Sequence, residues 1–438
     1  MKSSTSERKV EQQLLTAWAE PNDWEKFRRE MPEDLAEMAR SSKALVRGRK
    51  IKTAESLLRM VLVYAVRDWS LRMVGAWAVI QQVAAVSDVA LLYRFCQCQQ
   101  WLGQLLMRVL QQQNMYLRQL AGVRLRLIDT TGISQPGSVG SDWRIHVSMD
   151  LGKMCLDGVE ITNGHQKESL ARFPSRADEI WVADRGFAFA NKLAVVLQAA
   201  AFLVVRIGWS TLSLTTHGKQ RLNLINWIKP LAQITERTVF LSTERGNFPL
   251  RLIVCPLPPD QAERARERLR KHARKKGKKV QPNTLLAAGF VLLISNLPVE
   301  LWPPGRILYL YRLRWQVELQ FKRMKSLLCF DHLRAQDPRL VQTYLLAKLL
   351  AAVLLDRLVR QAEEQHPELF QSLHRPVSLW RLHHLLWAAI CDWIVGTLSI
   401  DRVFAALPWL HRYLCDSPRS RIQQLAWARR FLVRLSYV

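Results

Sequence analysis

Apolar residues in the first part of the chain, up to about residue 115, recur at the three- and four-residue spacing of amphipathic helices. Thr53, Ser70 and Ser87 each stand just before such a run and predict helix N-caps. The predicted helices cover 54–66, 71–83 and 88–98. The last two resemble a helix-turn-helix, although a plain helical bundle would give the same pattern.

The periodicity changes at residue 123, where shorter apolar runs predict strands. Predicted strands cover 123–128, 143–151, 155–162, 179–184 and 201–206, and predicted helices cover 168–173 and 189–200. The order is therefore three strands, a helix, a strand, a helix and a strand. This is the order of elements in a ribonuclease-H-like core, an α/β fold.

Residues 207–300 would interrupt that core with a mostly β insertion. Strand-like runs at 238–242 and 250–254 precede a basic segment at 262–279, which has ten Lys or Arg residues against two acids. The first part of this segment suits a charged helix. It is either a plain solvated face or a surface for the DNA backbone, and the charge of the whole chain favours the second interpretation.

The pattern of residues 310–328 predicts a helix with a core face made of Leu310, Leu313, Val317, Phe321, Met324 and Leu328. Offsets of three, four and seven residues place four polar side chains within an adjoining stripe about 60° wide: Tyr311, Arg314, Glu318 and Lys325. A carboxylate beside a core, flanked by cations, suits a metal site that handles phosphates. A long apolar helix over 341–360 follows, and the remainder reads as helical.

Composition adds a partner to this picture. The 64 Lys and Arg residues against 37 Asp and Glu give a net charge of +27, which predicts a polyanion partner and most simply nucleic acid. Arg47, Arg49, Lys50 and Lys52 form a basic run just before the helix over 54–66 and favour DNA contact there.

Other features exclude several classes. The seven cysteines show neither a disulfide framework nor zinc-site spacing and predict buried reduced thiols. Residues 1–11 are polar and do not form a signal peptide. Apolar runs at 344–355 and 382–400 contain Lys348 and Asp392 and predict buried helices, so we expect a cytoplasmic protein without a membrane partner.

Three acids stand out by context. Asp129 follows the first predicted strand, Asp184 ends the fourth, and Glu318 lies on the striped helix. In a ribonuclease-H-like core the ends of the first and fourth strands lie side by side, and the helix after the insertion packs against them. We therefore predict Asp129, Asp184 and Glu318 as catalytic, metal-binding residues. They would hold two divalent cations about 3.5–4 Å apart, and hard oxygen ligands suit Mg²⁺ or Mn²⁺.

Each acid also has an ordinary structural explanation. Asp129 can be a turn acid at a strand end, Asp184 a local partner of Arg185, and Glu318 a surface acid paired with Arg314. The joint pattern favours the catalytic interpretation, because three coincidences must share one fold order.

Four further acids compete as site carboxylates. Asp150 and Asp157 look like turn acids, whereas Glu160 and Glu179 fit exposed strand positions.

The three acids and the striped helix resemble those of a bacterial family of insertion-sequence DDE transposases. This family, the insertion sequence four family, has a Tyr-x2-Arg-x3-Glu-x6-Lys signature. Asp129, in Leu-Ile-Asp-Thr-Thr, and Asp184, in Val-Ala-Asp-Arg-Gly-Phe, match the two aspartates of that family. The resemblance covers roughly residues 120–350. The spacing matches throughout the signature, which comprises Tyr311, Arg314, Glu318 and Lys325.

The resemblance implies a DNA transposase that acts by cut-and-paste and is associated with the nucleoid when bound. It would form a homodimer in the synaptic complex, cleave the terminal inverted repeats of its element and join the 3′ ends to target DNA. It would use Mg²⁺, for which Mn²⁺ substitutes, with two ions per site and no covalent protein–DNA intermediate.

The same resemblance assigns DNA contacts. Tyr311, Arg314 and Lys325 would bind phosphates of the element end, and Arg185 would contact DNA beside Asp184. Relatives pass through a DNA hairpin whose flipped base stacks on an aromatic residue. Trp315 and Phe290 are candidates for such stacking, although either also fits core packing, and we do not extend the hairpin route to this chain.

Four regions follow from these patterns. We expect a helical DNA-binding region at 1–118, a catalytic core at 119–206 and 301–355, a β-rich insertion at 207–300, and a helical region for dimerisation at 356–438. Two other functions fit the same fold: a catalytically inactive or domesticated DNA-binding relative, and a ribonuclease-H-like repair nuclease. The intact acids argue against the first, and the insertion and signature argue against the second.

Overall fold

The computed structural model describes residues 23–119, 123–177, 179–217, 220–370, 377–398, 400–406, 410 and 413. The chain divides into two compact units. The first comprises residues 1–107, 334–351 and 387–438, and the second comprises residues 108–333 and 352–386.

The first unit is helical in the part that the structure describes. Its elements include α2 (Asp23–Arg29), α3 (Leu35–Ser41), α4 (Ala54–Val66), α5 (Leu71–Ile80), α6 (Asp88–Phe95), the start of α7 (Gln99–Gln119) and α17 (Ile400–Ala406). The three predicted N-caps are confirmed. Side-chain oxygens of Thr53, Ser70 and Ser87 each accept a hydrogen bond from a backbone N–H three residues later.

Two of these helices end earlier than their apolar pattern predicts. Helix α5 ends at Ile80, because Gln82 adopts a left-handed backbone with a φ of 57° and the N–H of Val83 bonds to the carbonyl of Ala78 at 2.8 Å. Helix α6 ends at Phe95, and the chain turns there into α7.

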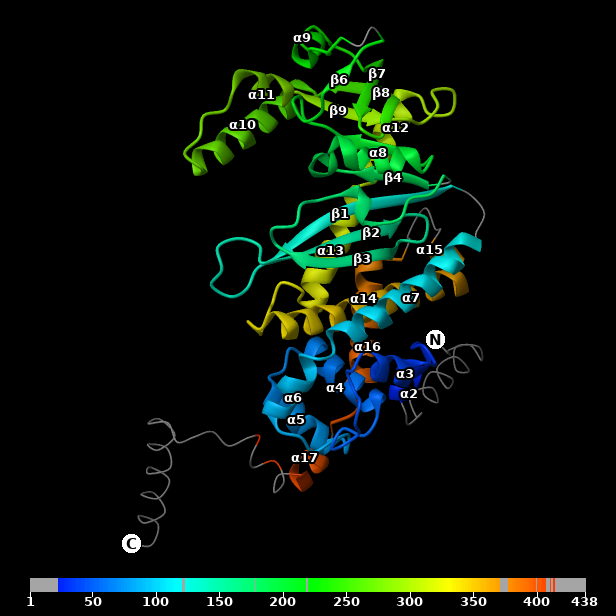
Figure 1. The fold of residues 1–438 in the computed structure, drawn as a ribbon, viewed down its shortest axis with the longest axis vertical. Coiled ribbons are helices and arrows are strands. Elements are labelled where there is room, and N and C mark those ends of the chain that lie inside the picture. Colours follow the sequence, from blue (N-terminus) through cyan, green and yellow to red (C-terminus); the bar gives the residue numbers. More distant parts are fainter. Residues whose placement is uncertain are drawn as a thin grey trace, which may run out of the picture. The chain divides into compact units, whose positions relative to one another are not determined.

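The second unit is built on one nine-stranded sheet (Figure 1). Its strands are β1 (Arg124–Ile133), β2 (Trp143–Asp150), β3 (Cys155–Asn163), β4 (Glu179–Ala183), β5 (Phe202–Arg206), β6 (Leu214–Thr215), β7 (Thr235–Thr243), β8 (Gly246–Pro256) and β9 (Phe290–Ser295). They lie in the order β3-β2-β1-β4-β5-β9-β8-β7-β6. Strand β4 runs parallel to β1 and β5, and every other neighbouring pair is antiparallel.

The first five strands of this order form the predicted ribonuclease-H-like core. Helix α8 (Ala190–Gln198) follows β4 as expected. Between β3 and β4 we expected a helix over 168–173, but the structure has only the 3-10 turn η1 (Leu170–Arg172), capped by the side chain of Ser169.

Strand β9 joins the insertion to this core. It pairs with β5 through Val204 opposite Ser295 and with β8 along its whole length, so β6 to β9 extend the core sheet. The hydrophobic pattern did not single out this strand. Its last four residues are buried, because side chains on both of its faces pack inside the unit. Helices α9 (Leu224–Ile228), α10 (Pro259–Lys275) and α11 (Pro282–Ala287) complete the region.

One hydrophobic cluster runs across the junction of core and insertion. It joins Trp181 of β4 and Leu203 of β5 to Leu252 of β8 and Leu292 of β9, and Leu193 of α8 packs against them. Each such buried side chain contributes about 1.5–3 kcal/mol. The end of the β1–β4 pair therefore rests on a continuous core.

The striped segment is two helices, which corrects the prediction of one. Helix α12 (Pro304–Arg312) ends before Leu313, and α13 (Trp315–Leu328) begins after Arg314. The N–H groups of Leu313 and Arg314 bond to carbonyls three residues earlier, so the chain tightens into a 3-10 turn there. The predicted core face is confirmed: only Leu313 among its six residues is half-buried rather than buried.

Three more helices follow: α14 (Pro338–Gln365), α15 (Pro367–Phe370) and α16 (Leu379–Val395). By length and composition α14 alone among the described residues suits a membrane span, but 78% of its apolar window is buried inside the protein. The second apolar run breaks at Gly396, whose φ is 71°. The first run is a buried helix, as expected, and Lys348 is fully buried in an ion pair with Asp68 at 3.0 Å. The second run forms most of α16, which buries one face only and leaves Leu385 71% exposed, so the prediction of a buried helix was wrong there.

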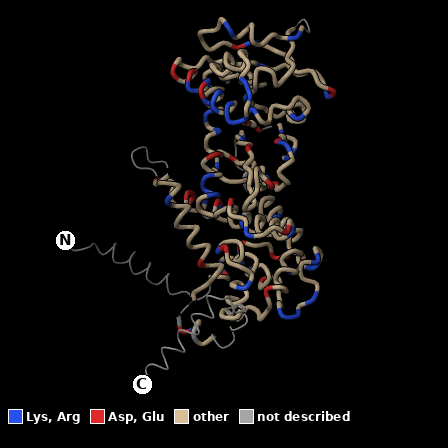
Figure 2. The backbone as a smooth tube through the Cα atoms, turned by 90° about the vertical axis from the view of Figure 1, so that its left-hand side faces the viewer, with Lys and Arg blue, Asp and Glu red and all other residues tan. Residues whose placement is uncertain are grey.

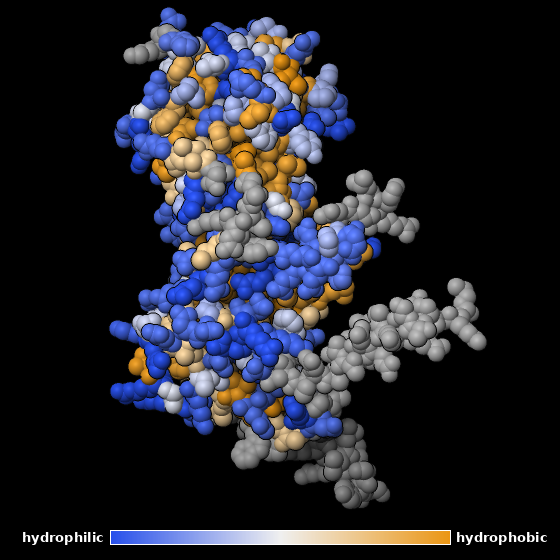
Figure 3. All heavy atoms as spheres, turned by 90° about the vertical axis from the view of Figure 1, so that its right-hand side faces the viewer, coloured by the Kyte–Doolittle hydropathy of each residue, from blue (hydrophilic) through white to orange (hydrophobic). Residues whose placement is uncertain are grey.

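Charge and hydropathy follow the expected division between surface and core. Lys and Arg occur throughout both units (Figure 2), and hydrophilic residues predominate on the face drawn in Figure 3, where hydrophobic residues form separate patches. Of the six described cysteines, four are buried, and Cys255 and Cys329 are half-buried.

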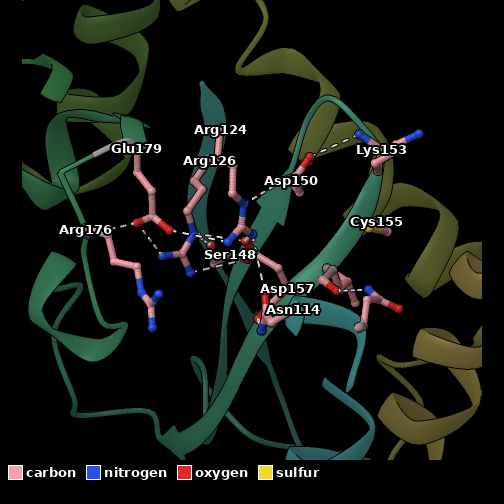
Figure 4. Close-up of polar contacts among 12 residues, drawn as sticks. Asn114, Arg124, Arg126, Ser148, Asp150, Lys153, Cys155, Asp157, Arg176 and Glu179 are labelled. Atoms are coloured by element: carbon pink, nitrogen blue, oxygen red, sulfur yellow. Dashed lines mark hydrogen bonds and ion pairs between the residues drawn. The ribbon is translucent and has the colours of Figure 1, made fainter. Parts of the chain in front are cut away.

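A buried ionic cluster on β1 corrects two of the sequence assignments, those of Asp157 and Glu179 (Figure 4). Asp150 accepts a hydrogen bond from the N–H of Lys153 at 3.1 Å, as a turn acid does. Asp150, Asp157 and Glu179 are buried and surround Arg124 and Arg126, so Glu179 is no exposed strand residue. Asp157 accepts from Arg124 Nη2 at 2.7 Å and lies 2.9 Å from Arg126 Nε. These acids serve the two guanidinium groups and are not free to act as site ligands.

Candidate active site

The sequence suggested that Asp129 stands at the end of the first strand, but it lies within β1. The strand continues to Ile133 because β2 pairs with it as far as Trp143. The parallel pairing with β4, however, ends at Ile128 opposite Ala183. Asp129 on β1 and Asp184 just after β4 are the next residues, so the two predicted acids lie side by side beyond the parallel pairing.

The carboxylate of Asp129 is largely enclosed, with 17% of its side chain exposed. Burial raises its pKa to about 6, and the negative charges of Asp184 and Glu168 act in the same direction. The N–H of Thr130, which donates to Oδ1 at 2.8 Å, and the guanidinium of Arg314 oppose the shift.

Asp184 is half-buried at the exit of β4. Its side chain accepts a hydrogen bond from the backbone N–H of Arg185 and so caps the 3-10 turn η2 (Arg185–Phe187). The hydroxyl of Tyr311, from α12, donates to Asp184 Oδ1 at 3.4 Å. One signature residue therefore contacts the second aspartate directly.

Arg314 connects the other two acids. Its Nη1 donates to Asp129 Oδ2 at 3.1 Å and its Nη2 to Glu318 Oε1 at 2.5 Å. Burial disfavours the charge of Arg314, but Tyr311 and the three acids outweigh burial and hold the pKa of the guanidinium above its usual value. The turn between α12 and α13 places this side chain between a strand residue and a helix residue.

The donor set fits divalent cations, although Arg314 bridges it here. In the described part of the chain no three Asp, Glu, His or Cys side chains lie close enough together to hold a metal ion, so Asp129, Asp184 and Glu318 are not gathered around one point in this structure. Asp129 and Asp184 nevertheless present hard carboxylate oxygens just past the paired ends of adjacent strands, and such oxygens are the ligands that Mg²⁺ and Mn²⁺ prefer. Glu318 joins them through its contact with Arg314.

Glu168 is a fourth carboxylate that the sequence patterns missed. A Cβ built on Gly186 would lie 1.6 Å from Glu168 Oε2, so the carboxylate packs directly over this glycine, two residues after Asp184. Burial and the charge of Asp184 raise the pKa of Glu168. The one available signal was the Asp-Arg-Gly sequence, which we took only as a tight exit from the strand.

Comparison with known proteins decides the family. Residues 124–354, more than half of the 438, match the family model described as "Transposase DDE domain". The chain belongs to this family. It is an insertion-sequence DDE transposase, an enzyme that acts on DNA and depends on divalent metal ions.

Relatives along most of the chain agree with this assignment. The putative transposase InsL for insertion sequence element IS186A of Escherichia coli is 39% identical over 348 residues, which are 77% of this chain and 93% of the relative. The transposase for insertion sequence element IS421 of Escherichia coli is 39% identical over 349 residues, with the same shares covered. A solved piggyBac transposase synaptic complex with hairpin DNA aligns at a TM-score of 0.45 with 10% identity, covering 92% of this chain and 87% of that one.

A pocket of about 810 Å³ opens beside Asp184 in the transposase. Phe290 of β9 and Trp209 lie in its wall, together with Arg185 and Arg206 from the core. Ala265, Arg268, Leu269 and His272 form one stripe of α10 along its other side. The basic helix of the insertion thus faces the site acids across a cavity.

Two other residues that we predicted as DNA contacts, Trp315 and Lys325, lie on α13. Trp315, at the start of α13, is 59% exposed and is not part of the core. Lys325 is half-buried in the last turn of α13, and in the part of the chain that the structure describes no hydrogen bond or ion pair joins it to the three acids.

Proposed function

We propose that this transposase binds the terminal inverted repeats of its element, cleaves them and joins the freed 3′ ends to target DNA by cut-and-paste. The observation that carries the proposal is the placement of Asp129 and Asp184 as adjacent residues just past the β1–β4 pairing, with Glu318 tied to Asp129 through Arg314. A phosphodiester bound at this end of the β1–β4 pair would meet three acids from three elements. It would also meet the cations Arg185 and Arg314.

Asp129, Asp184 and Glu318 would hold Mg²⁺, or Mn²⁺ in its place, with two ions per site. Ions bound there would activate the attacking hydroxyl and stabilise the leaving oxygen. In the DNA-free protein Arg314 supplies part of the missing positive charge. When ions and DNA bind, its guanidinium turns to the phosphates, which it binds bidentately.

Six residues would contact the element end. Tyr311, Arg314 and Lys325 bind its phosphates, and Arg185, which is exposed in the wall of the pocket beside Asp184, binds the strand that leaves the site. Trp315 offers an exposed ring on which an unpaired base can stack. Phe290, inside the same pocket as Arg185, offers a second ring.

The regional assignments follow from this chemistry. Residues 1–118 would recognise the ends, the core at 119–206 and 301–355 would cut and join, and the insertion at 207–300 would hold DNA along α10. Residues 356–438 would contribute to a homodimer that pairs two ends in one complex. Much of 356–438 lies outside the described residues.

Glu318→Gln tests the proposal. It keeps the size of the side chain but removes the charge, so cleavage of a duplex carrying the terminal repeat and joining of pre-cut ends should both fall to background in Mg²⁺. Binding of the duplex, measured by gel shift, should persist. Glu300→Gln, an exposed acid away from the site, is the control and should leave all three measurements unchanged.

Two results would overturn the proposal: normal cleavage by Glu318→Gln, or cleavage by the unaltered protein without any joining of 3′ ends. The second result would favour a repair nuclease.

A further inference from the structure

In the first unit the basic loop before α4 and the helix α6 share one pocket of about 440 Å³. Cations from the loop, at Arg47, Arg49 and Lys50, line one side. The other side is made by α6 and the residues next to it. None of the side chains that line the pocket is acidic: Arg47, Arg49, Lys50, Ile51, Val86, Ser87, Ala90, Tyr93, Arg94 and Gln97.

The loop is fixed to the helix. Arg94 of α6 donates from Nη1 to the carbonyl of Ala44 at 2.9 Å, and Leu45 and Ile51 bury their side chains. The loop folds tightly at Gly48, where a Cβ would lie 2.8 Å from the carbonyl oxygen of Lys52. Its cations are therefore held at a set distance from α6.

The face of α6 beside these cations is exposed and mostly uncharged. Val89 and Tyr93 are 56% and 69% exposed, and Ala90 and Gln97 are exposed next to them. Val89, Ala90 and Tyr93 lie on one side of α6, while Leu91 and Phe95 on the other side are fully buried. Gln97 follows in the turn after the helix, where its Oε1 accepts a hydrogen bond from Arg94 Nη1 at 3.4 Å. This uncharged face is open to a partner that also contacts the cations of the loop.

Charge identifies the partner. Arg47, Arg49, Lys50 and Lys52 have no acidic partner in the part of the first unit that the structure describes. The nearby acid Asp88 is already paired with Arg72 at 3.0 Å. A surface with an uncharged helix face and unpaired cations on its rim complements a duplex groove bordered by phosphates better than it complements an acidic or apolar protein.

We propose that α6 enters the major groove of the element's terminal repeat, where Tyr93 and Gln97 read base edges and Val89 and Ala90 contact thymine methyl groups. Arg47, Arg49 and Lys50 bind the phosphates beside that groove. The inference rests on the proposed function and names the surface by which the enzyme distinguishes its own ends from other DNA.

Full-length protein provides the test, with two duplexes of equal length: one carries the terminal repeat, and the other carries the same bases scrambled. Gln97→Ala should reduce the ratio of the two affinities by about tenfold, because a bidentate base contact is lost. Arg49→Ala and Lys50→Ala should weaken binding to both duplexes alike and lower the slope of log affinity against log salt by about 0.9 each. Arg40→Ala, an exposed cation on α3, is the matched control and should change neither.

Three outcomes would overturn this assignment: unchanged discrimination by both Gln97→Ala and Tyr93→Ala, equal weakening on both duplexes by Gln97→Ala, or an altered oligomeric state of Tyr93→Ala with intact DNA discrimination. Tyr93→Phe, which keeps the ring and removes the hydroxyl, separates lost readout from lost folding, and circular dichroism checks each variant.

The result is independent of the catalytic proposal. Loss of discrimination by Gln97→Ala supports the surface even if the acids prove inactive. Conversely, Glu318→Gln should keep the unaltered protein's preference for the terminal repeat over the scrambled duplex while it fails to cleave either of them.

Discussion

Arg314 Nη1 lies 3.1 Å from Asp129 Oδ2, and the same guanidinium donates to Glu318 from its other terminal nitrogen. An arginine of the signature thus neutralises two of the proposed metal ligands in the DNA-free protein. Since a cation and Arg314 compete for the same oxygens, the strength of ion binding depends on where this side chain points.

Arg314→Ala should therefore have opposite effects on two ligands. Affinity of the DNA-free protein for Mn²⁺, measured by calorimetry, should rise about tenfold, because roughly 1.4 kcal/mol of competition is removed. Affinity for the element end should fall, since a bidentate phosphate contact is lost. Arg312→Ala, an exposed cation at the end of α12, serves as the control. If Mn²⁺ affinity fell together with DNA affinity, Arg314 would support the metal site instead of competing with it.

Asp129 gives the cation-free protein a distinctive dependence on pH. Its pKa is raised from 3.8 to about 6, mainly because it is buried, so the folded state keeps a proton that the unfolded chain has released. The free energy of unfolding should consequently fall as the pH rises from about 4 to about 6, by about 2 kcal/mol.

Asp129→Asn cannot lose that proton. In chelator, the difference between the urea stabilities of the unaltered protein and Asp129→Asn should change across this pH range, and divalent-ion affinity of the unaltered protein should weaken below pH 6. The difference removes the effect of other groups such as His146, whose pKa is lowered to about 4 mainly by burial. Parallel stability profiles for the two proteins would contradict the raised pKa.

Features set by neighbouring residues were predictable from the sequence. The caps at Thr53, Ser70 and Ser87 depend on hydrogen bonds that reach three residues along the chain. The succession of strands and helices along the core depends on local apolar runs. Asp129 and Asp184 became candidates because each stands at the end of a predicted strand. That β1 continues past Asp129 was not predictable, since the cause is its pairing with β2.

Features set by distant residues escaped the sequence. Glu179 is a charged residue at the start of a strand and so fits an exposed position, yet it is buried because Arg124 and Arg126 of β1 reach it. Glu168 has no motif of its own and reaches the site only over Gly186. The break between α12 and α13 contains neither Gly nor Pro, so helical periodicity runs through it.

Gly186→Ala tests whether Glu168 takes part in ion binding. The new Cβ would collide with Glu168 Oε2 and displace the carboxylate, while Gly305→Ala, with open space around it, is the matched control. Mn²⁺ affinity should fall about three- to tenfold in Gly186→Ala and in Glu168→Gln. The double variant should be no weaker than either single variant, because both remove the same contact. Additive losses would mean that Gly186 acts independently of Glu168.

Asp157, an acid of the buried ionic cluster, should contribute far more to stability than Glu160, although both residues lie on β3. Asp157 is fully buried between Arg124 and Arg126, so Asp157→Ala leaves two guanidinium groups short of a partner and should cost about 3–5 kcal/mol in urea unfolding. Glu160→Ala removes an acid that is 41% exposed and paired with Arg172 alone, and should cost about 0–1 kcal/mol. Because β1 also carries Asp129, the first substitution should weaken Mn²⁺ binding as well, and the second should not. Equal losses of stability would show that the buried cluster contributes no more than a surface ion pair.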